Sequence, residues 1–311
     1  MQRRRWVRLV GFVLAFVLLS VLSLVRFDIP REELIAQYAP SPSQFADIEG
    51  MRVHYRDEGE GPPLVLVHGT SASLHTWDGW ASRLSSHRRV VRLDLRGFGL
   101  TGPAPDRDYR PGRMAQDVAL LMDHLGIDRA DIAGNSLGGN VAMHFALAHP
   151  ERVRKLVLLD STGLSGFEPP PIFKLARTPL LNNLMLFATP RFVIELNVRD
   201  VYGDPSRVDD ALVDRYWAFS RAEGNRRALV DHFQGPRGAT FDERLGELRM
   251  PVLVMWGARD RWVPPSFATR FEHGLPNATV IRYPTAGHVP MEELPEQTAA
   301  DVDRFLGEAL P

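Results

Sequence analysis

The 311-residue sequence contains no cysteine. A chain without thiols has no disulfide framework and lacks the cysteine ligands of most structural zinc sites. Its ten histidines include no H-E-x-x-H or comparable metal-binding spacing. We therefore expect neither a metal nor another cofactor. The absence of cysteine does not distinguish a reducing compartment from an oxidising one.

The sequence also lacks an excess of charge of either sign. Its formal net charge is −1 at pH 7, so the composition gives no indication of a nucleic-acid partner. The segment Gly97-Phe98-Gly99 is no phosphate-binding loop, because it has neither a Lys-Ser/Thr ending nor a complete G-x-G-x-x-G. With 44% hydrophobic residues the chain can bury a full core, and one domain with an insertion accounts for its length.

Ser136 lies in the most informative segment, I-A-G-N-S-L-G-G at residues 132–139. An apolar, strand-like stretch precedes this G-x-S-x-G pattern, and a helical pattern follows it. A serine on such a sharp turn is held in a strained backbone conformation, while Gly134 and Gly138 keep neighbouring side chains away. The turn lifts the hydroxyl above the carboxyl end of a sheet and the first N–H groups of a helix. We therefore predict that Ser136 is a nucleophile.

Three further loops, each directly after a predicted buried strand, provide the groups that such a serine needs. Thr70 follows the first of these strands, and its backbone N–H and that of Leu137 are placed to stabilise an oxyanion. Asp260 and His288 follow the other two. A histidine takes the proton of the serine, and a carboxylate orients the histidine. The four loops together predict a Ser-His-Asp triad.

From about Phe45 to Leu310 the sequence resembles the α/β-hydrolase fold superfamily, in the branch of esterases, lipases and meta-cleavage-product hydrolases. The resemblance is carried by the chain order serine, acid, histidine, by the G-N-S-L-G-G elbow and by a D-x-R-G-x-G loop that begins at Asp94. It implies an α/β fold with a mostly parallel eight-stranded sheet, flanking helices and a helical cap. It also implies the roles just derived: nucleophile Ser136, acid Asp260, base His288, and oxyanion-hole residues Thr70 and Leu137.

Some polar residues near these loops invite other interpretations. Asp160 closes the strand at 153–159 and is the alternative acid, because some members of the superfamily draw their acid from that strand. Asp94 and Arg96 stand at a strand end, where we expect a buried ion pair or a loop brace rather than catalysis. His54 is expected at the surface.

The N-terminus has the one long hydrophobic run. Basic residues within 1–8 precede an uncharged apolar run from Leu9 to Val25, and Arg26 closes it. At about 1.5 Å per residue the run spans roughly 25 Å, near the lower limit for crossing a bilayer. We predict a signal anchor, a transmembrane helix within residues 1–26. The positive-inside rule then places the catalytic domain on the exoplasmic side, the periplasm in a bacterium. The alternative is a cleaved signal peptide and a secreted protein.

Residues 27–44 are expected to form a linker, and residues 45–311 the hydrolase domain, with the cap at about 163–248. The cap segment is rich in large apolar residues, which predicts an apolar pocket. We therefore expect a membrane-tethered serine hydrolase that acts, without a cofactor, on small-molecule carboxylic esters with apolar acyl or alcohol groups.

Three alternatives remain: a carbon–carbon bond hydrolase of the meta-cleavage type, a cofactor-free haloperoxidase and a catalytically inactive binding module. Carbon–carbon hydrolases of this type usually have a tryptophan directly after the catalytic histidine, where this sequence has Val289. They also place a cap arginine against the substrate carboxylate, for which this chain offers Arg177, Arg191 and Arg199. The missing aromatic wall favours the ester reaction.

Overall fold

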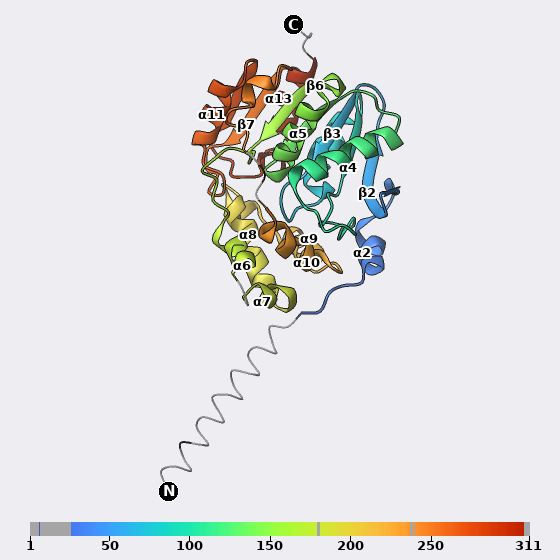
Figure 1. The fold of residues 1–311 in the computed structure, drawn as a ribbon, viewed down its shortest axis with the longest axis vertical. Coiled ribbons are helices and arrows are strands. Elements are labelled where there is room, and N and C mark those ends of the chain that lie inside the picture. Colours follow the sequence, from blue (N-terminus) through green and yellow to red (C-terminus); the bar gives the residue numbers. More distant parts are fainter. Residues whose placement is uncertain (1–5, 7–25, 179–180, 237, 239, 308–311) are drawn as a thin grey trace.

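The computed structural model describes residue 6 and residues 26–178, 181–236, 238 and 240–307. Its centre is an eight-stranded sheet with the order β1-β2-β4-β3-β5-β6-β7-β8 (Figure 1). β2 pairs antiparallel with β1 and β4, and every other pairing is parallel. The predicted mostly parallel sheet is thereby confirmed. The strands are β1 (Ser43–Ile48), β2 (Met51–Glu58), β3 (Pro63–Val67), β4 (Arg89–Leu93), β5 (Ala130–Asn135), β6 (Val153–Leu159), β7 (Val252–Gly257) and β8 (Ala278–Tyr283).

Helices cover both faces of the sheet. One core cluster joins one face of the sheet to α4 (Pro111–His124), α5 (Leu137–Ala148) and α11 (Ser266–Gly274). A second cluster joins the opposite face to α3 (Asp78–Leu84) and α13 (Pro295–Gly307). Because both faces are covered, every residue of β5 and β7 is buried. This explains why the central strands appear in the sequence as continuous apolar runs. The shorter elements of this part are α2 (Arg31–Tyr38), η1 (Leu74–Trp77), η2 (Pro150–Arg152) and α12 (Pro290–Glu293).

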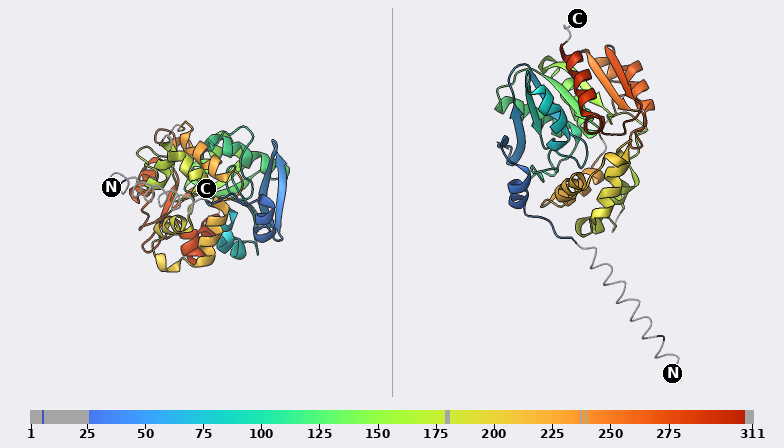
Figure 2. Two further views of the ribbon diagram at one scale, coloured as in Figure 1. Left: turned by 90° about the horizontal axis from the view of Figure 1, so that it is seen from below. Right: turned by 180° about the vertical axis from the view of Figure 1, so that it is seen from behind.

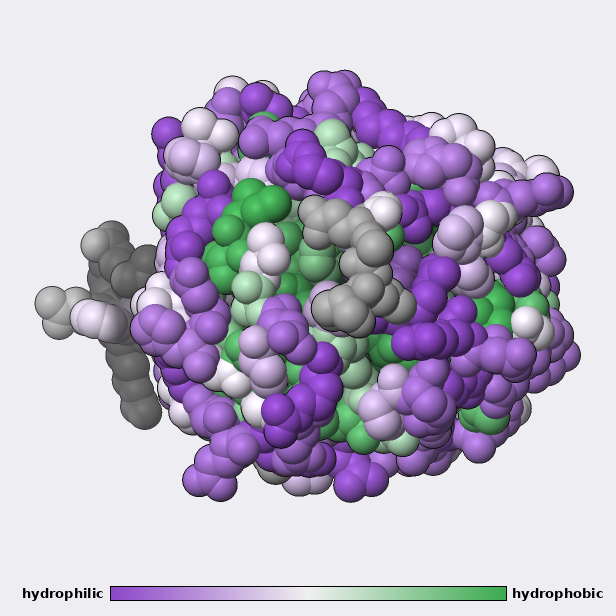
Figure 3. All heavy atoms as spheres, turned by 90° about the horizontal axis from the view of Figure 1, so that it is seen from above, coloured by the Kyte–Doolittle hydropathy of each residue, from purple (hydrophilic) through white to green (hydrophobic). Residues whose placement is uncertain are grey.

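A group of helices leaves the sheet between β6 and β7 and lies over the carboxyl ends of the parallel strands. The front and rear views agree on this placement (Figures 1 and 2). Its elements are α6 (Pro171–Arg177), α7 (Leu181–Phe187), α8 (Arg191–Val201), η3 (Pro205–Arg207), α9 (Asp210–Ser220), α10 (Asn225–Gln234) and η4 (Leu245–Glu247). We refer to α6–α10 as the cap. At the opposite end, the surface is mainly hydrophilic with hydrophobic side chains near its centre (Figure 3).

The predicted fold is corrected at the N-terminus. Within the described residues, no helix is both long and apolar enough to cross a membrane. The first helix after the predicted anchor, α2, has eight residues, whereas a transmembrane helix needs about 20 apolar ones. The apolar run on which the prediction depended, residues 9–25, lies outside the described residues. A transmembrane helix is therefore not supported as part of the fold.

Candidate active site

Ser136 occupies a sharp turn between β5 and α5. Its φ of 54° lies in the left-handed region that non-glycine residues rarely adopt, and its N–H donates to Leu159 O at 2.9 Å. The flanking glycines are required by space. A Cβ on Gly134 would lie 2.2 Å from Gly138 O, and one on Gly138 would lie 2.1 Å from Val67 O. The turn therefore has the strained geometry that the sequence predicted.

Asp260 and His288 form a buried pair in the loops after β7 and β8. His288 Nδ1 lies 2.8 Å from Asp260 Oδ2. The other carboxylate oxygen of Asp260 accepts hydrogen bonds from the backbone N–H groups of Trp262 at 2.7 Å and Val263 at 3.0 Å. A carboxylate with three donors is fixed in place, and it assigns the proton of the imidazole to Nδ1. Nε2 of His288 is then left as an acceptor.

The loop that carries His288 is held by both the sheet and the cap. The backbone N–H of His288 donates to Val201 O at 2.7 Å, at the end of α8. The carbonyl of His288 accepts a hydrogen bond from Nδ2 of Asn135 at 3.0 Å. Asn135 directly precedes the predicted nucleophile. Glu293 is buried on α12 and accepts from Gly287 N at 2.6 Å. The position of the imidazole therefore depends on contacts far apart in the sequence.

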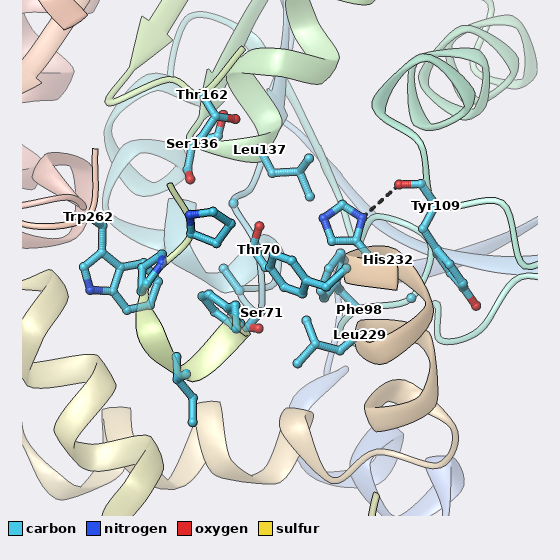
Figure 4. Close-up of a pocket in the computed structure, with 18 of the residues that line it drawn as sticks. Thr70, Ser71, Phe98, Tyr109, Ser136, Leu137, Thr162, Leu229, His232 and Trp262 are labelled. Carbon is cyan, nitrogen blue, oxygen red and sulfur yellow. Dashed lines mark hydrogen bonds between the residues drawn. The ribbon is translucent and has the colours of Figure 1, made fainter. Parts of the chain in front are cut away.

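Ser136, His288, Thr70 and Leu137 all line one cavity of about 620 Å³ between the sheet and the cap. Figure 4 shows Ser136 under α5 with its hydroxyl toward the cavity, and Thr70 on the neighbouring loop. No hydrogen bond joins the Ser136 and His288 side chains in the described part of the chain. Such bonds often tighten only when the substrate binds. Asp260 is not among the lining residues and lies behind His288.

The two predicted oxyanion donors lie on either side of the nucleophile. Leu137 is the first residue of α5, and Thr70 follows Gly69 after β3. Gly69 packs so closely on the elbow that a Cβ there would lie 2.9 Å from Asn135 Oδ1 and 3.1 Å from Ser136 Cβ. This close contact brings the Thr70 backbone beside the nucleophile. The oxyanion-hole role of the two N–H groups stays a prediction.

The residues that invited other interpretations have structural contacts. Arg96 forms a buried bidentate pair with Asp117, with nitrogen–oxygen distances of 2.5 and 2.7 Å, as the expected brace requires. Asp94 accepts from two backbone N–H groups and from His54 Nδ1 at 2.7 Å. Burial raises the pKa of Asp94, but His54, His68 and His75 together outweigh burial and hold this pKa well below its usual range. The expectation for His54 was wrong, because its side chain is fully buried.

Trp262 is a cavity residue that the sequence did not single out. Its ring centroid lies 5.7 Å from that of His288, with 33° between the planes. Its Nε1 donates to Asp200 Oδ2 on α8 at 2.9 Å. Val289 leaves no aromatic side chain directly after His288, but Trp262 supplies an aromatic ring beside the imidazole from another loop. Only the three-dimensional approach of the two loops reveals this, although Trp262 follows Asp260 by two positions.

The three cap arginines differ in where they lie. Arg191 pairs with Asp210 and Asp214, and Arg199 pairs with Glu195 at 3.0 Å. Of the three, Arg177 is the one that lines the cavity, and its Nε donates to Phe233 O at 2.7 Å.

His232 on α10 faces the cavity from the other side and donates to Tyr109 O at 2.9 Å (Figure 4). Burial lowers the pKa of His232, so the ring is neutral at pH 7. Because Arg177 lines the cavity and Arg191 and Arg199 do not, Arg177 is the one of the three cap arginines that is placed to meet a substrate.

One cluster within the described residues has donor atoms close enough to share a metal ion, all within 4.8 Å of one another: Asp160, Asp260 and His288. In this cluster the Asp260–His288 hydrogen bond already occupies the facing atoms, and an ion there would have to displace it. We assign no metal to the site.

Replacing Glu293 by alanine is expected to destabilise the fold. The Glu293 carboxylate accepts from the N–H groups of Gly287, Gly203 and Asp204. Leaving a buried donor unpaired costs about 1–3 kcal/mol, so Glu293→Ala should lower the free energy of unfolding by about 3 kcal/mol or more. Denaturant unfolding measures this loss, and the exposed Glu296→Ala is the control. A loss below about 1 kcal/mol would show that the three hydrogen bonds to Glu293 do not stabilise the fold.

Comparison with known proteins agrees with this geometry. The family model of the alpha/beta hydrolase fold matches residues 62–295, which is most of the chain. The chain belongs to the α/β-hydrolase family, and it is a hydrolase.

Its relatives include enzymes with more than one named activity. The chain is 33% identical over 273 residues to 2-hydroxymuconate semialdehyde hydrolase of Pseudomonas putida, which covers 84% of this chain and 92% of that protein. It superimposes on a meta-cleavage product hydrolase of Pseudomonas fluorescens with a TM-score of 0.73 and 28% identity, over 86% and 97% of the two chains. A membrane phospholipase A, described as a bacterial virulence factor, gives a TM-score of 0.75 and 27% identity over 98% of each chain.

Proposed function

We propose that this hydrolase cleaves an acyl bond through an acyl-enzyme on Ser136. The observation that carries the proposal is the strained Ser136 in one cavity with an imidazole that Asp260 orients. His288 Nε2 takes the proton as Ser136 Oγ attacks the carbonyl carbon, and Asp260 stabilises the resulting imidazolium. The N–H groups of Thr70 and Leu137 receive the oxyanion. The leaving group departs with the proton from His288, and water then hydrolyses the acyl-enzyme.

We rank cleavage of a carbon–carbon bond first. The names of the relatives support this ranking over the ester reaction that the sequence favoured. The site adds two observations, a cationic Arg177 on the cavity wall and the Trp262 ring beside His288. In this reaction Ser136 Oγ bonds to a ketone carbon and the adjacent carbon–carbon bond breaks. The electron pair of that bond passes to the leaving fragment, where a conjugated keto acid delocalises it, and His288 protonates the carbon. Arg177 would hold the carboxylate of that fragment.

Ester hydrolysis is the second candidate, because much of the cavity wall is apolar. Cap side chains such as Phe173, Leu175, Met185 and Val193 line it, and Val289 follows His288. The loss of hydration in such surroundings costs a charged substrate much more free energy than a neutral acyl ester. The likeness to a phospholipase A over 98% of each chain supports the same candidate. No observation in the described part of the chain favours a haloperoxidase or an inactive binding module.

The ratio of kcat/KM values for two substrate sets distinguishes the candidates. One set contains 2-hydroxy-6-oxo-dienoates, the other neutral esters of graded acyl length. Carbon–carbon cleavage predicts the highest kcat/KM for a dienoate. It also predicts that Arg177→Gln lowers that value by about 10–100-fold, since a hydrogen bond to a charged group contributes about 1.5–3 kcal/mol, and leaves ester hydrolysis nearly unaffected.

Arg199→Gln is the matched control, because Arg199 pairs with Glu195 on the cap. If an ester exceeds every dienoate and Arg177→Gln changes neither set, the carbon–carbon hypothesis is wrong and the ester hypothesis stands.

A further inference from the structure

Asp160 and Asp260 bring two carboxyl groups together behind the imidazole of His288. Asp160 ends β6 and Asp260 follows β7, the neighbouring strand, and both side chains are buried. An oxygen of Asp160, an oxygen of Asp260 and a nitrogen of the imidazole all lie within 4.8 Å of one another. Two ionised carboxylates this close in a dry interior repel each other, and neither offers a donor to the other, so a shared site of this kind favours a proton on one of them.

The hydrogen-bond partners show which carboxyl group is the anion. Asp260 accepts from His288 Nδ1 and from two backbone N–H groups, which stabilise its charged form. Asp160 has one such partner, since its Oδ1 accepts from Gly257 N at 2.9 Å. Its Oδ2 accepts no hydrogen bond from any described residue. An oxygen without a donor in a dry interior is the favoured position for the proton.

We propose that Asp160 is a positioning residue that keeps a proton on Oδ2. Through this proton it donates a hydrogen bond to Asp260, and the hydrogen bond fixes the triad carboxylate toward His288. The proposed role of Asp160 rests on the proposed function, in which Asp260 is the acid of the triad. The backbone gives Asp160 little freedom, with a φ of 44° and an N–H that donates to Met255 O at 3.0 Å. The site then carries a single negative charge to balance the imidazolium.

The charges around Asp160 favour its neutral form. Burial raises the pKa of Asp160 well above its usual range, and the charges of Asp260 and Glu293 add to the increase. The hydrogen bond from the Gly257 N–H lowers the pKa of Asp160, but burial and the two nearby carboxyl groups outweigh this effect. Two further titratable groups lie near Asp160: His288, with an imidazole nitrogen within 4.8 Å of an Asp160 oxygen, and the phenol of Tyr283 on β8. Burial and the nearby carboxyl groups of Asp301 and Asp160 raise the pKa of Tyr283.

Two variants show whether Asp160 acts through a hydrogen bond that it donates or only through the volume that its side chain fills. In Asp160→Asn the amide oxygen can still accept from Gly257 N, and the amide nitrogen can still donate to Asp260. Asp160→Leu has a similar volume and no donor. We expect Asp160→Leu to lower the rate constant for reaction at Ser136 by about 10–100-fold, the size of effect that loss of orienting partners has at metal sites. Asp160→Asn should recover most of that loss.

The measured quantity is the rate constant for fluorophosphonate labelling of Ser136 in the full chain as a function of pH. A neutral Asp160 predicts the same midpoint of the acid limb in wild type and Asp160→Asn. If Asp160 is ionised, the amide removes a negative charge near the imidazole, and the midpoint moves down by about 1 pH unit or more. Such a displacement overturns the proposal, and so does an Asp160→Leu variant labelled as fast as wild type.

Infrared spectroscopy tests the proton without any catalysis. Wild type should show the carbonyl band of a buried protonated carboxylic acid, and Asp160→Asn should lack it. An unchanged spectrum overturns the proposal, even if Asp160→Leu does not fold. If wild type is not labelled at Ser136 at all, the proposed function fails, while the infrared band still decides whether Asp160 holds a proton.

Discussion

Ser136→Ala is expected to lower turnover by about 10⁴–10⁶-fold, because removal of a triad nucleophile leaves only binding and oxyanion stabilisation. The same change should abolish covalent labelling by a fluorophosphonate, which wild type should take up at one site per chain. Labelling is read by mass spectrometry of the intact protein and its peptides. The substitution removes one oxygen from a turn that hydrogen bonds already hold, so the fold should persist.

Ser73→Ala is the matched control. Ser73 Oγ lies 3.2 Å from His75 Nδ1, but Ser73 is not among the residues that line the cavity. Its replacement should leave both labelling and turnover near the wild-type values. If label appears on another serine, or if Ser136→Ala keeps its activity, Ser136 is not the nucleophile and the proposed mechanism is wrong.

The sheet and the four loops at its edge could be predicted because their signals are local. Strands buried on both faces appear as continuous apolar runs such as residues 252–257, whatever their partners are. The turn at Ser136 needs glycine on both sides for space, and this requirement is visible in the sequence. Parallel strands place their carboxyl ends at one edge. Asp260 and His288 could therefore be expected together, although 28 residues separate them.

The walls of the cavity could not be predicted, because they depend on how the cap lies on the sheet. Nothing near Arg177 in the sequence distinguishes it from Arg191 and Arg199, and only its contact with Phe233, 56 residues away, places it at the cavity. Glu293 likewise reaches Gly203 across 90 residues. The apolar run at residues 9–25 has a strong local signal, but it lies outside the described residues, and its predicted transmembrane helix is corrected.

The ranking of the two reactions shows how one residue can mislead. Val289 stands directly after His288, at the position where carbon–carbon hydrolases of the meta-cleavage type usually have a tryptophan. In the structure an aromatic ring does lie beside His288, but it comes from Trp262, two residues after the acid and on a different loop. The residue after His288 therefore does not decide between ester and carbon–carbon cleavage. In the proposed mechanism, the difference between the two reactions lies with Arg177 and with the charge of the substrate.

Asp260→Asn should reduce kcat by about 10⁴-fold, as loss of the orienting carboxylate does in other triads. An amide that donates to Nδ1 would turn the imidazole to the wrong tautomer, so that Nε2 carries the proton and cannot accept one from Ser136. The two backbone N–H groups that now bond to Asp260 would still find an amide oxygen, so the variant should fold. Circular dichroism and thermal unfolding check this.

Asp160→Asn is the matched comparison, since it makes the same chemical change on the neighbouring strand. We expect it to be mild, because an amide there can accept from Gly257 and donate to Asp260 in place of the acid. Steady-state kcat for both variants, measured on the substrate with the highest wild-type kcat/KM, gives the comparison. The opposite pattern, with Asp160→Asn inactive and Asp260→Asn active, would move the triad acid to β6. Asp260 would then be the carboxyl group that holds the proton, and the hydrogen-bond argument for an ionised Asp260 would be wrong.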